Sequence, residues 1–495
     1  KMVSLAFDPK SEANVIAWAT TEHAHDGAYD TLVDIDEKTM REFDKPPDSE
    51  NVSSVDGFIR SMDAAAQALQ QHDIHLDPQN DRQADQSEHH AKWKGARDKE
   101  TDALFRNKVI ASETATRAEI GRASVLSMKW VYKLKSDGTF KARLVIRGFT
   151  QREGDNTYDK DMVLSPTAHG PSVRILLASS VQLGRHVGTF DVANAFQQGE
   201  FIAGEVIFVR MPKNAGGDVR RLLTPLYGLK QSARSFQEKL TSVLVKQLNF
   251  SRAFYESCLY TYEEVDASGE TQRLDILVHV DDGLYSTTDL EMKERKFAEL
   301  GKELQFTDEC ELSTYLGVDY TYDRNKGICT ASSEGYFRRS FQRRHRGFML
   351  KPDFGASKGR ETPFDPAINL SPCDDDELYD EGTCPINMRV IVGVLSYAAS
   401  TTRPDISYIV NVLASSVNDP RPKHVRAAYH VMCYIAGTID MGIVYSRKKT
   451  NNDHDWRLEA FSDADWASET TSRRSRTGII LMMCGAPMLW KSHLQ

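Results

Sequence analysis

Two adjacent aspartates beside a hydrophobic run are the residues of this sequence whose types and spacing most directly suggest chemistry. The run Ile276–Val280 is rich enough in β-branched residues to form a buried strand, and Asp281-Asp282-Gly283 has the composition of a tight turn. Leu284 and Tyr285 begin a return strand, so the pattern predicts a hairpin with two carboxylates at its tip. Taken alone, the pattern is more typical of an ordinary Asp-Gly turn, and a second acidic position is needed to favour chemistry.

Asp191 supplies that second position. A strand pattern that begins at Val187 ends at Asp191, and the alternation is lost after it, where a turn or helix begins. On its own Asp191 is typical of a helix N-cap. Three carboxylates at the ends of adjacent strands could instead bind two divalent cations roughly 3.5 to 4 Å apart, which would activate an attacking hydroxyl and stabilise a leaving pyrophosphate. Carboxylate and water ligands favour Mg²⁺, with Mn²⁺ as the alternative.

The same acidic residues lie in two short blocks of distinctive sequence. Asp191–Phe196 reads Asp-Val-Ala-Asn-Ala-Phe, and His279–Asp282 reads His-Val-Asp-Asp. They resemble the Asp-Val-x-x-Ala-Phe block and the Tyr-Val-Asp-Asp hairpin of the reverse transcriptase in copia-type long-terminal-repeat retrotransposons. The resemblance extends from about Trp93 to the C-terminus. It implies an RNA-directed DNA polymerase that adds nucleotides to a primer 3′-hydroxyl, with the three aspartates as catalytic residues and ligands of two Mg²⁺ ions.

Further blocks imply the nucleotide pocket. Phe196 matches the aromatic residue with which the family excludes a ribose 2′-hydroxyl. Leu226–Phe236 resembles the family's block Leu-Tyr-Gly-Leu-Lys-Gln-Ser-Pro-Arg, in which Tyr227 shapes the pocket and the turn at Gly228 lets the backbone approach the nascent base pair. Ser232 is expected to cap the helix that follows it.

The segment 125–149 has the pattern of a two-stranded hairpin around Asp137-Gly138. Period-two alternation places its basic residues on one face, which is more often simply solvated. The segment resembles the fingers hairpin of the family, and the resemblance implies contacts with the nucleotide triphosphate and template phosphates. The basic residues are Lys133, Lys135, Lys141, Arg143 and Arg147.

Several residues are expected to contact template and primer by the same resemblance. His279 replaces the usual Tyr of the hairpin beside the primer end, where the alternative is a buried, hydrogen-bonded histidine. A basic helix from Tyr336 to Arg346 suits a thumb helix along a duplex, and a merely exposed basic helix is as typical of this pattern. The expected nucleic-acid contacts are Lys230, His279, Leu316, Gly317, Arg338, Arg339 and Arg343.

The expected fold is α+β: a right-hand polymerase with fingers, a ferredoxin-like palm and thumb, followed by a connection segment and a truncated ribonuclease H-like end. Glu205–Pro212 is expected to be the next palm strand. Asp463 matches a metal carboxylate of ribonuclease H, but the later carboxylates are missing, so no ribonuclease H activity is expected from this chain. The expected divisions are 1–90 acidic linker, 91–325 fingers and palm, 326–372 thumb-like region, 373–452 linker and connection segment, and 453–495 ribonuclease H-like start.

Composition limits the remaining possibilities. Of the 495 residues, the first 100 carry 11 Lys and Arg against 21 Asp and Glu, so the acidic excess lies in the N-terminal arm and the rest of the chain is nearly neutral. The seven cysteines are scattered without Cys-x-x-Cys spacing, which argues against zinc and fits an intracellular protein. A virus-like particle or the nucleus is the expected location. The chain begins with Lys1 and is expected to be a piece of a polyprotein.

Two other functions remain open from the sequence. A decayed transposon fragment would bind nucleic acid, or nothing, without catalysis. A nucleotide cyclase shares the sheet topology, but its Gly-Gly-Asp/Glu-Glu-Phe turn is absent. For the polymerase, the expected partners are an RNA template, a primer–template duplex and deoxynucleoside triphosphates, with integrase and the rest of ribonuclease H in the same polyprotein, no membrane, and a homodimer as an open arrangement.

Overall fold

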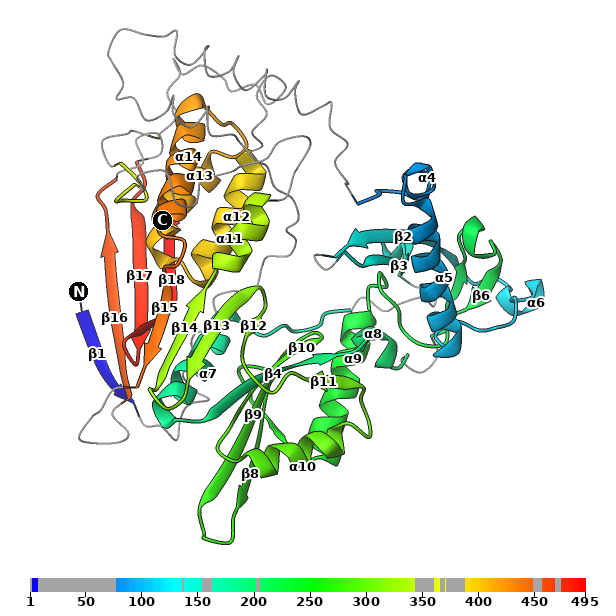
Figure 1. Cartoon of the computed structure of the whole chain (residues 1–495), viewed down its shortest axis with the longest axis horizontal. Coiled ribbons are helices and arrows are strands. Elements are labelled where there is room, and N and C mark those ends of the chain that lie inside the picture. The colour runs from blue at the N-terminus through cyan, green and yellow to red at the C-terminus, as the bar shows by residue number, and fades with distance from the viewer. Residues whose placement is uncertain are drawn as a thin grey trace. The chain divides into compact units, whose positions relative to one another are not determined.

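The computed structural model describes residues 2–7, 77–135, 138–153, 163–201, 205–342, 360–365, 370, 388–447, 456–467 and 473–495. The acidic linker expected over 1–90 lies mostly outside these residues. The chain divides into two compact units. The central unit contains 74–168 and 190–309, and the flanking unit contains 1–73, 169–189 and 310–495. Helices and sheets occur in both units, so the expected α+β class is confirmed (Figure 1).

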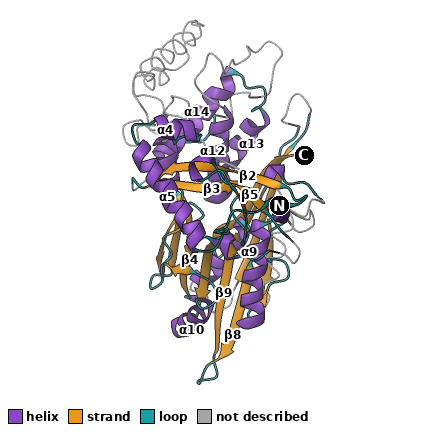
Figure 2. Cartoon of the chain, turned by 90° about the vertical axis from the view of Figure 1, so that its right-hand side faces the viewer, coloured by secondary structure: helices purple, strands orange, loops and turns teal. Residues whose placement is uncertain are grey.

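A six-stranded sheet forms the main part of the central unit, with the strand order β11-β4-β10-β9-β8-β7. Helices α9 (Ser232–Thr241) and α10 (Leu290–Leu300) lie beside strands β8 and β9 (Figure 2). A π-helical turn, Ser242–Gln247, extends α9. The strands are β4 (His186–Val192), β7 (Ser251–Arg252), β8 (Leu259–Val265), β9 (Thr271–His279), β10 (Asp282–Thr287) and β11 (Phe306–Asp308).

Alternation along the strands creates the core between this sheet and its helices. Alternate residues of β9, namely Leu274, Ile276 and Val278, are apolar and buried in one cluster with residues of α9 and α10. The helical spacing predicted for α9 is confirmed, because its apolar residues enter this cluster. Members of the cluster include Tyr260, Leu274, Ile276, Val278, Tyr285, Phe236, Leu240, Val243 and Leu244.

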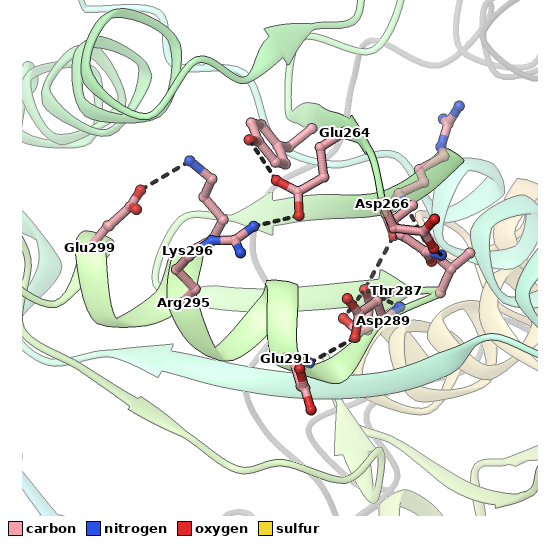
Figure 3. A network of polar contacts seen from close by, with 12 residues as sticks. Glu264, Asp266, Thr287, Asp289, Glu291, Arg295, Lys296 and Glu299 are labelled. Atoms are coloured by element: carbon pink, nitrogen blue, oxygen red, sulfur yellow. Dashed lines mark hydrogen bonds and ion pairs between the residues drawn. The ribbon is translucent and has the colours of Figure 1, made fainter. Parts of the chain in front are cut away.

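Polar contacts attach α10 to the same sheet (Figure 3). The Asp289 side chain caps the helix by accepting a hydrogen bond of 2.9 Å from the backbone N–H of Glu291. Along the helix, Arg295 forms an ion pair with Glu264 of β8, and the Lys296 ammonium lies 4.2 Å from the centre of the Tyr262 ring. The contacts of Arg295 and Lys296 hold the helix against β8, the strand that precedes the acidic hairpin.

A second sheet of the central unit contains the basic hairpin, with the strand order β3-β2-β5-β6. Helix α5 (His90–Arg106) packs against it through Trp93, whose ring lies 4.6 Å from that of Phe140. Glu205–Pro212 was expected in the palm sheet, and this expectation is wrong: its strand pairs with β2 and β6. The strands are β2 (Val125–Leu134), β3 (Phe140–Ile146), β5 (Phe208–Arg210) and β6 (Val219–Arg221), and the short helices are α4 (Asp81–Gln86), α6 (Arg117–Ile120) and α8 (Ala195–Gln198).

The flanking unit contains two four-stranded sheets, β12-β13-β14-β15 and β1-β16-β17-β18. The proline expected in the first turn of helix α7 (Gly170–Leu183) is present there. Its other helices are α11 (Glu334–Gln342), α12 (Met388–Thr401), α13 (Ser407–Ser415) and α14 (Pro422–Gly437). Its strands are β1 (Met2–Phe7), β12 (Thr314–Tyr315), β13 (Val318–Asp323), β14 (Ile328–Ser332), β15 (Gly442–Ser446), β16 (Trp456–Ala464), β17 (Arg476–Met483) and β18 (Ala486–Leu494).

The side chain of Arg174 joins three elements of the flanking unit. It is buried, donates a hydrogen bond of 2.6 Å to the carbonyl of Met488, and lies 4.3 Å from the centre of the Trp490 ring. It also donates to carbonyls at the end of α12. These contacts connect α7, α12 and β18. Because the charge of Arg174 is buried, the loss of one of its partners would be costly. In the described part of the chain, no helix is long and apolar enough to cross a membrane.

Candidate active site

The acidic hairpin has a different turn from the one expected. Asp282 pairs with His279 across the hairpin, so the two-residue tip consists of Val280 and Asp281. Gly283 was expected in the turn, but it lies inside strand β10. Val280 has a φ of 62°, which is unusual for a β-branched residue and marks local backbone strain. The tip is held by long-range pairing rather than by the Asp-Gly sequence, which is why local turn statistics placed it one or two residues too late.

Asp191 comes from the neighbouring strand. It is exposed near the end of β4, and the next residue, Val192, donates a backbone hydrogen bond of 2.9 Å to the carbonyl of Asp281. The N-cap alternative for Asp191 is wrong, because helix α8 begins at Ala195 and its N-cap residue is Asn194. The hydrogen bond between Val192 and Asp281 therefore brings the two acidic blocks together within the central unit.

Electrostatics show that these carboxylates repel one another. The pKa of Asp282 is raised to about 6, first by burial and then by the charges of Asp281, Asp191 and Glu309. The pKa of Asp191 is also raised, first by burial and then by Asp281 and Glu309, while Lys141 opposes the shift. Glu309 is a fourth acidic group of this site that sequence reasoning missed, since no motif surrounds it.

The carboxylate oxygens of this site are the kind of ligand atom that a divalent cation binds. Ionised carboxylates offer only acceptor oxygens, which Mg²⁺ prefers, and a cation would relieve the repulsion that raises their pKa values. As the side chains stand, no group of three or more His, Cys, Asp or Glu among the described residues is placed to hold a metal ion. Three carboxylates thus come within electrostatic range of one another without forming a closed ligand set.

The raised pKa of Asp282 predicts how stability depends on pH without metal. The folded state keeps the proton up to about pH 6, whereas the ordinary value is 3.8, so folding binds a proton between these limits and stability falls as pH rises through them. Melting temperatures measured as a function of pH in a chelating buffer check this prediction. At pH values above 6, added Mg²⁺ should raise the melting temperature. Asp282→Asn should lack this component of the fall, and an identical pH profile in that variant would contradict the prediction.

Three side chains expected in the nucleotide pocket do lie together. The rings of Phe196 and Tyr227 meet edge to face with centroids 5.1 Å apart, and the Arg143 guanidinium lies 5.0 Å from the centre of the Tyr227 ring. The pKa of Tyr227 is raised by burial and by the charges of Asp281 and Asp191, and Arg143 opposes the shift. A cation and two aromatic rings thus lie within electrostatic range of the carboxylates.

The basic residues of the hairpin share one face, as predicted. Lys133 is exposed and lies opposite Lys141, which is half-buried. The pKa of Lys141 is lowered, first by burial and then by Arg143 and Lys135, while Glu100 and Asp191 oppose the shift. Lys141 is therefore the member of this face whose charge is coupled to the acidic site. The loop residues 136–137 at the hairpin turn lie outside the described residues.

Gly228 makes a close backbone contact with the hairpin. It has a φ of 95°, and a Cβ there would lie 2.0 Å from the carbonyl oxygen of Ile146. A Cβ at Gly148 would lie 1.9 Å from the carbonyl oxygen of Gly228. The two glycines allow the Tyr227 turn and the end of strand β3 to touch, and Ile146 donates a hydrogen bond of 2.8 Å to the carbonyl of Tyr227.

Gln151 fixes the same turn and was not identified from the sequence. Its side chain is buried, accepts a hydrogen bond of 2.9 Å from the backbone N–H of Lys230, and donates one of 3.1 Å to the side chain of Gln231. The Lys230 ammonium donates to the carbonyl of Gln151 at 3.1 Å. Ser232 does not cap helix α9 as expected, because its hydroxyl donates to the carbonyl of Leu226 instead.

The residues expected to contact nucleic acid are placed in both units. His279 is half-buried, and its Nδ1 lies 3.2 Å from the carbonyl oxygen of Ala168, which agrees with a hydrogen-bonded histidine. In the flanking unit, Arg338 and Arg339 are exposed on α11, and the Tyr397 hydroxyl donates to the carbonyl of Leu316. At Gly317, a Cβ would meet the Tyr397 hydroxyl. Arg343 lies outside the described residues. Asp463, the residue matched to ribonuclease H, is exposed on β16.

A comparison with protein families finds a match for the central part of the sequence. Residues 121–343 match the family described as reverse transcriptase (RNA-dependent DNA polymerase). This part of the chain is similar to the reverse transcriptase family. The match contains all three aspartates, Phe196 and the Tyr227 turn.

Relatives of this chain confirm the resemblance to copia-type transposons. The chain is 30% identical over 382 residues to the retrovirus-related Pol polyprotein from transposon RE1 of Arabidopsis thaliana, covering 75% of this chain and 24% of the relative. It is 29% identical over 384 residues to the one from transposon TNT 1-94 of Nicotiana tabacum, covering 75% and 27%. It is 26% identical over 410 residues to the Transposon Ty1-LR2 Gag-Pol polyprotein of Saccharomyces cerevisiae, covering 80% and 22%. The chain spans about a quarter of the length of these relatives.

Solved structures with lower similarity were also found. The foamy viral protease-reverse transcriptase in complex with double-stranded DNA is 14% identical, with a TM-score of 0.44, and the match covers 95% of this chain and 70% of that one. The same viral protein in complex with an RNA/DNA hybrid is 11% identical, with a TM-score of 0.40, and the match covers 99% and 53%.

Proposed function

We propose that this chain is an RNA-directed DNA polymerase that extends a primer 3′-hydroxyl with deoxynucleotides. The observation that carries the proposal is the meeting, within one compact unit, of Asp191 with the Asp281-Asp282 hairpin, beside the Arg143–Tyr227–Phe196 group. The family match makes polymerisation the activity to test first. The RNA template and primer duplex are proposed as its partners because the described relatives are transposon polyproteins.

In this proposal each part of the site has a defined task. Asp191, Asp281 and Asp282 would hold two Mg²⁺ ions, which supply charge stabilisation at the reacting phosphate and favour ionisation of the primer hydroxyl. Arg143 and Lys141 would bind the triphosphate, since both are cationic and Arg143 is exposed beside Tyr227. The rigid contact between Gly228 and Ile146 keeps the Tyr227 turn at a fixed distance from strand β3, so the pocket retains its width.

Primer extension tests the proposal directly. The full chain would be incubated with a DNA primer annealed to an RNA template, deoxynucleoside triphosphates and Mg²⁺, and elongated primers would be resolved by length. Template-directed elongation that requires all four nucleotides is the expected result. Binding of the labelled duplex without elongation, in either Mg²⁺ or Mn²⁺, would instead favour the decayed fragment that retains only nucleic-acid binding.

Phe196→Ala should relax sugar selection. The ring of Phe196 packs edge to face on Tyr227, so its removal opens space at the proposed sugar position. We expect the preference for deoxyribonucleotides over ribonucleotides to fall by about tenfold to a hundredfold, which corresponds to roughly 1–3 kcal/mol of steric discrimination. Single-nucleotide kcat/KM values for each sugar measure it. Phe196→Tyr keeps the ring and should keep the preference, and unchanged selection in Phe196→Ala would remove Phe196 from the sugar pocket.

A further inference from the structure

Gly283 provides space for an aromatic ring rather than conformational freedom. It is buried in strand β10, next to Asp282, and its φ is not in the left-handed region. A Cβ built at this position would lie 2.1, 2.3 and 2.5 Å from Cζ, Cε1 and Cε2 of Phe190. Real Cβ atoms do not approach carbon this closely, so any side chain at Gly283 requires the ring or the strand to move.

The ring of Phe190 is confined on its other sides. Phe190 is 2% exposed, and its ring meets Phe297 and Phe306 edge to face, with centroids 5.4 and 5.6 Å apart. Phe297 and Phe306 also meet each other, at 5.4 Å. Because close-packed rings have no free volume to enter, a methyl group at Gly283 would displace β10 rather than the ring.

This contact lies directly beneath the acidic residues. Phe190 precedes Asp191 in β4, and Gly283 follows Asp282 in β10, which is the neighbouring strand of the sheet. Successive residues of a strand point to opposite faces, so the Phe190 ring fills the core face while Asp191 is exposed on the other. The separation of the two strands at this point sets the separation of their carboxylates.

We propose that Phe190 and Gly283 are a size-matched pair of positioning residues that sets the spacing between Asp191 and Asp282. The expected effects on kcat and on the Mg²⁺ requirement rest on the polymerase function proposed above. The pairing itself concerns the apo protein, since it depends on the volume of one ring and the absence of one side chain. A larger residue at 283 therefore needs a smaller one at 190.

A double-mutant cycle tests the pairing through wild type, Gly283→Ala, Phe190→Leu and the double variant. Leucine lacks the three ring atoms that a Cβ at 283 would meet, so the double variant removes the collision. We expect Gly283→Ala to lower the melting temperature by roughly 2–10 °C and kcat by about tenfold or more, and to raise the Mg²⁺ concentration for half-maximal rate. In the double variant, the alanine should cost less in both melting temperature and kcat than it costs in wild type.

Two control variants separate positioning from general destabilisation. Gly95→Ala makes the same chemical change inside helix α5, where nothing lies within 4 Å, and should leave kcat and the Mg²⁺ requirement unchanged without lowering the melting temperature, because alanine favours a helix more than glycine does. Met292→Ala weakens the same core from α10 and should lower the melting temperature without altering the Mg²⁺ requirement. Additive melting temperatures across the cycle would overturn the pairing. If the wild-type protein does not extend primers, the polymerase proposal fails, but the melting temperatures of the cycle still test the pairing. If Gly283→Ala is destabilised and its kcat and Mg²⁺ requirement are unaltered, the positioning role is overturned.

Discussion

Asp281→Asn combined with Asp282→Asn is expected to abolish primer extension, with kcat reduced by about a thousandfold or more. Metal ions that stabilise charge in a transition state contribute several kcal/mol, and roughly 4 kcal/mol corresponds to this factor. Asparagine keeps the shape of the side chain but carries no charge, so it is a poor ligand for Mg²⁺. Asp191→Asn should have an effect of the same order, since its strand is bonded to the hairpin tip. Single-turnover extension with saturating nucleotide measures the chemical step.

The stability of these variants should change in the opposite direction from their activity. Repulsion from Asp191 and Asp281 helps to raise the pKa of Asp282, so neutralising a member of the group removes an unfavourable interaction in the metal-free protein. We expect melting temperatures equal to or above that of wild type above pH 6. Asp98→Asn, an exposed carboxylate on α5, is the matched control and should retain full activity. Substantial residual extension by the double variant would refute the catalytic assignment.

Gly228→Ala should have the second large effect. The new Cβ would lie 2.0 Å from the Ile146 carbonyl oxygen, which is backbone and cannot rotate away, and the φ of 95° is unfavourable for alanine. Overpacking and backbone strain together predict a loss of roughly 3 kcal/mol or more in the free energy of unfolding. Displacement of Tyr227 should also reduce kcat/KM for the nucleotide by about a hundredfold. Denaturant titration and single-nucleotide kinetics check the two parts.

Gly269 offers a control that separates strain from steric collision. Its φ of 88° is close to that of Gly228, but a Cβ there would have nothing within 4 Å. Gly269→Ala should therefore cost only the backbone strain, about 1 kcal/mol, and leave nucleotide kinetics unchanged. If the two alanine variants were equally stable, the close contact between the Tyr227 turn and strand β3 would not be what requires glycine at 228.

Backbone strain at Val280 fits the way the acidic hairpin is held. A positive φ in a β-branched residue costs about 1–3 kcal/mol and persists only where the surroundings impose it. Here the pairing of Asp282 with His279 and the hydrogen bond from Val192 to Asp281 supply that constraint. A strained tip held by two strands keeps Asp281 in a defined position before any ligand binds.

The sequence by itself determined the acidic residues, the order of the family's blocks and most of the regular elements. Strand β9 and the buried stripe of α9 followed from periodicity, because burial of alternate or helically spaced side chains is a local property of the chain. The basic face of the hairpin followed for the same reason. The family match over residues 121–343 confirmed the resemblance carried by Asp191–Phe196 and His279–Asp282.

Only the tertiary structure decided which distant residues touch. It placed Glu205–Pro212 in the hairpin sheet, moved the tip of the acidic hairpin to Val280 and Asp281, added Glu309 to the acidic site, and showed that Gly283 accommodates Phe190. Each of these depends on contacts between segments far apart in the chain, and local propensity carries no information about such contacts. The chemical groups could therefore be identified from the sequence, whereas their spacing depends on long-range packing.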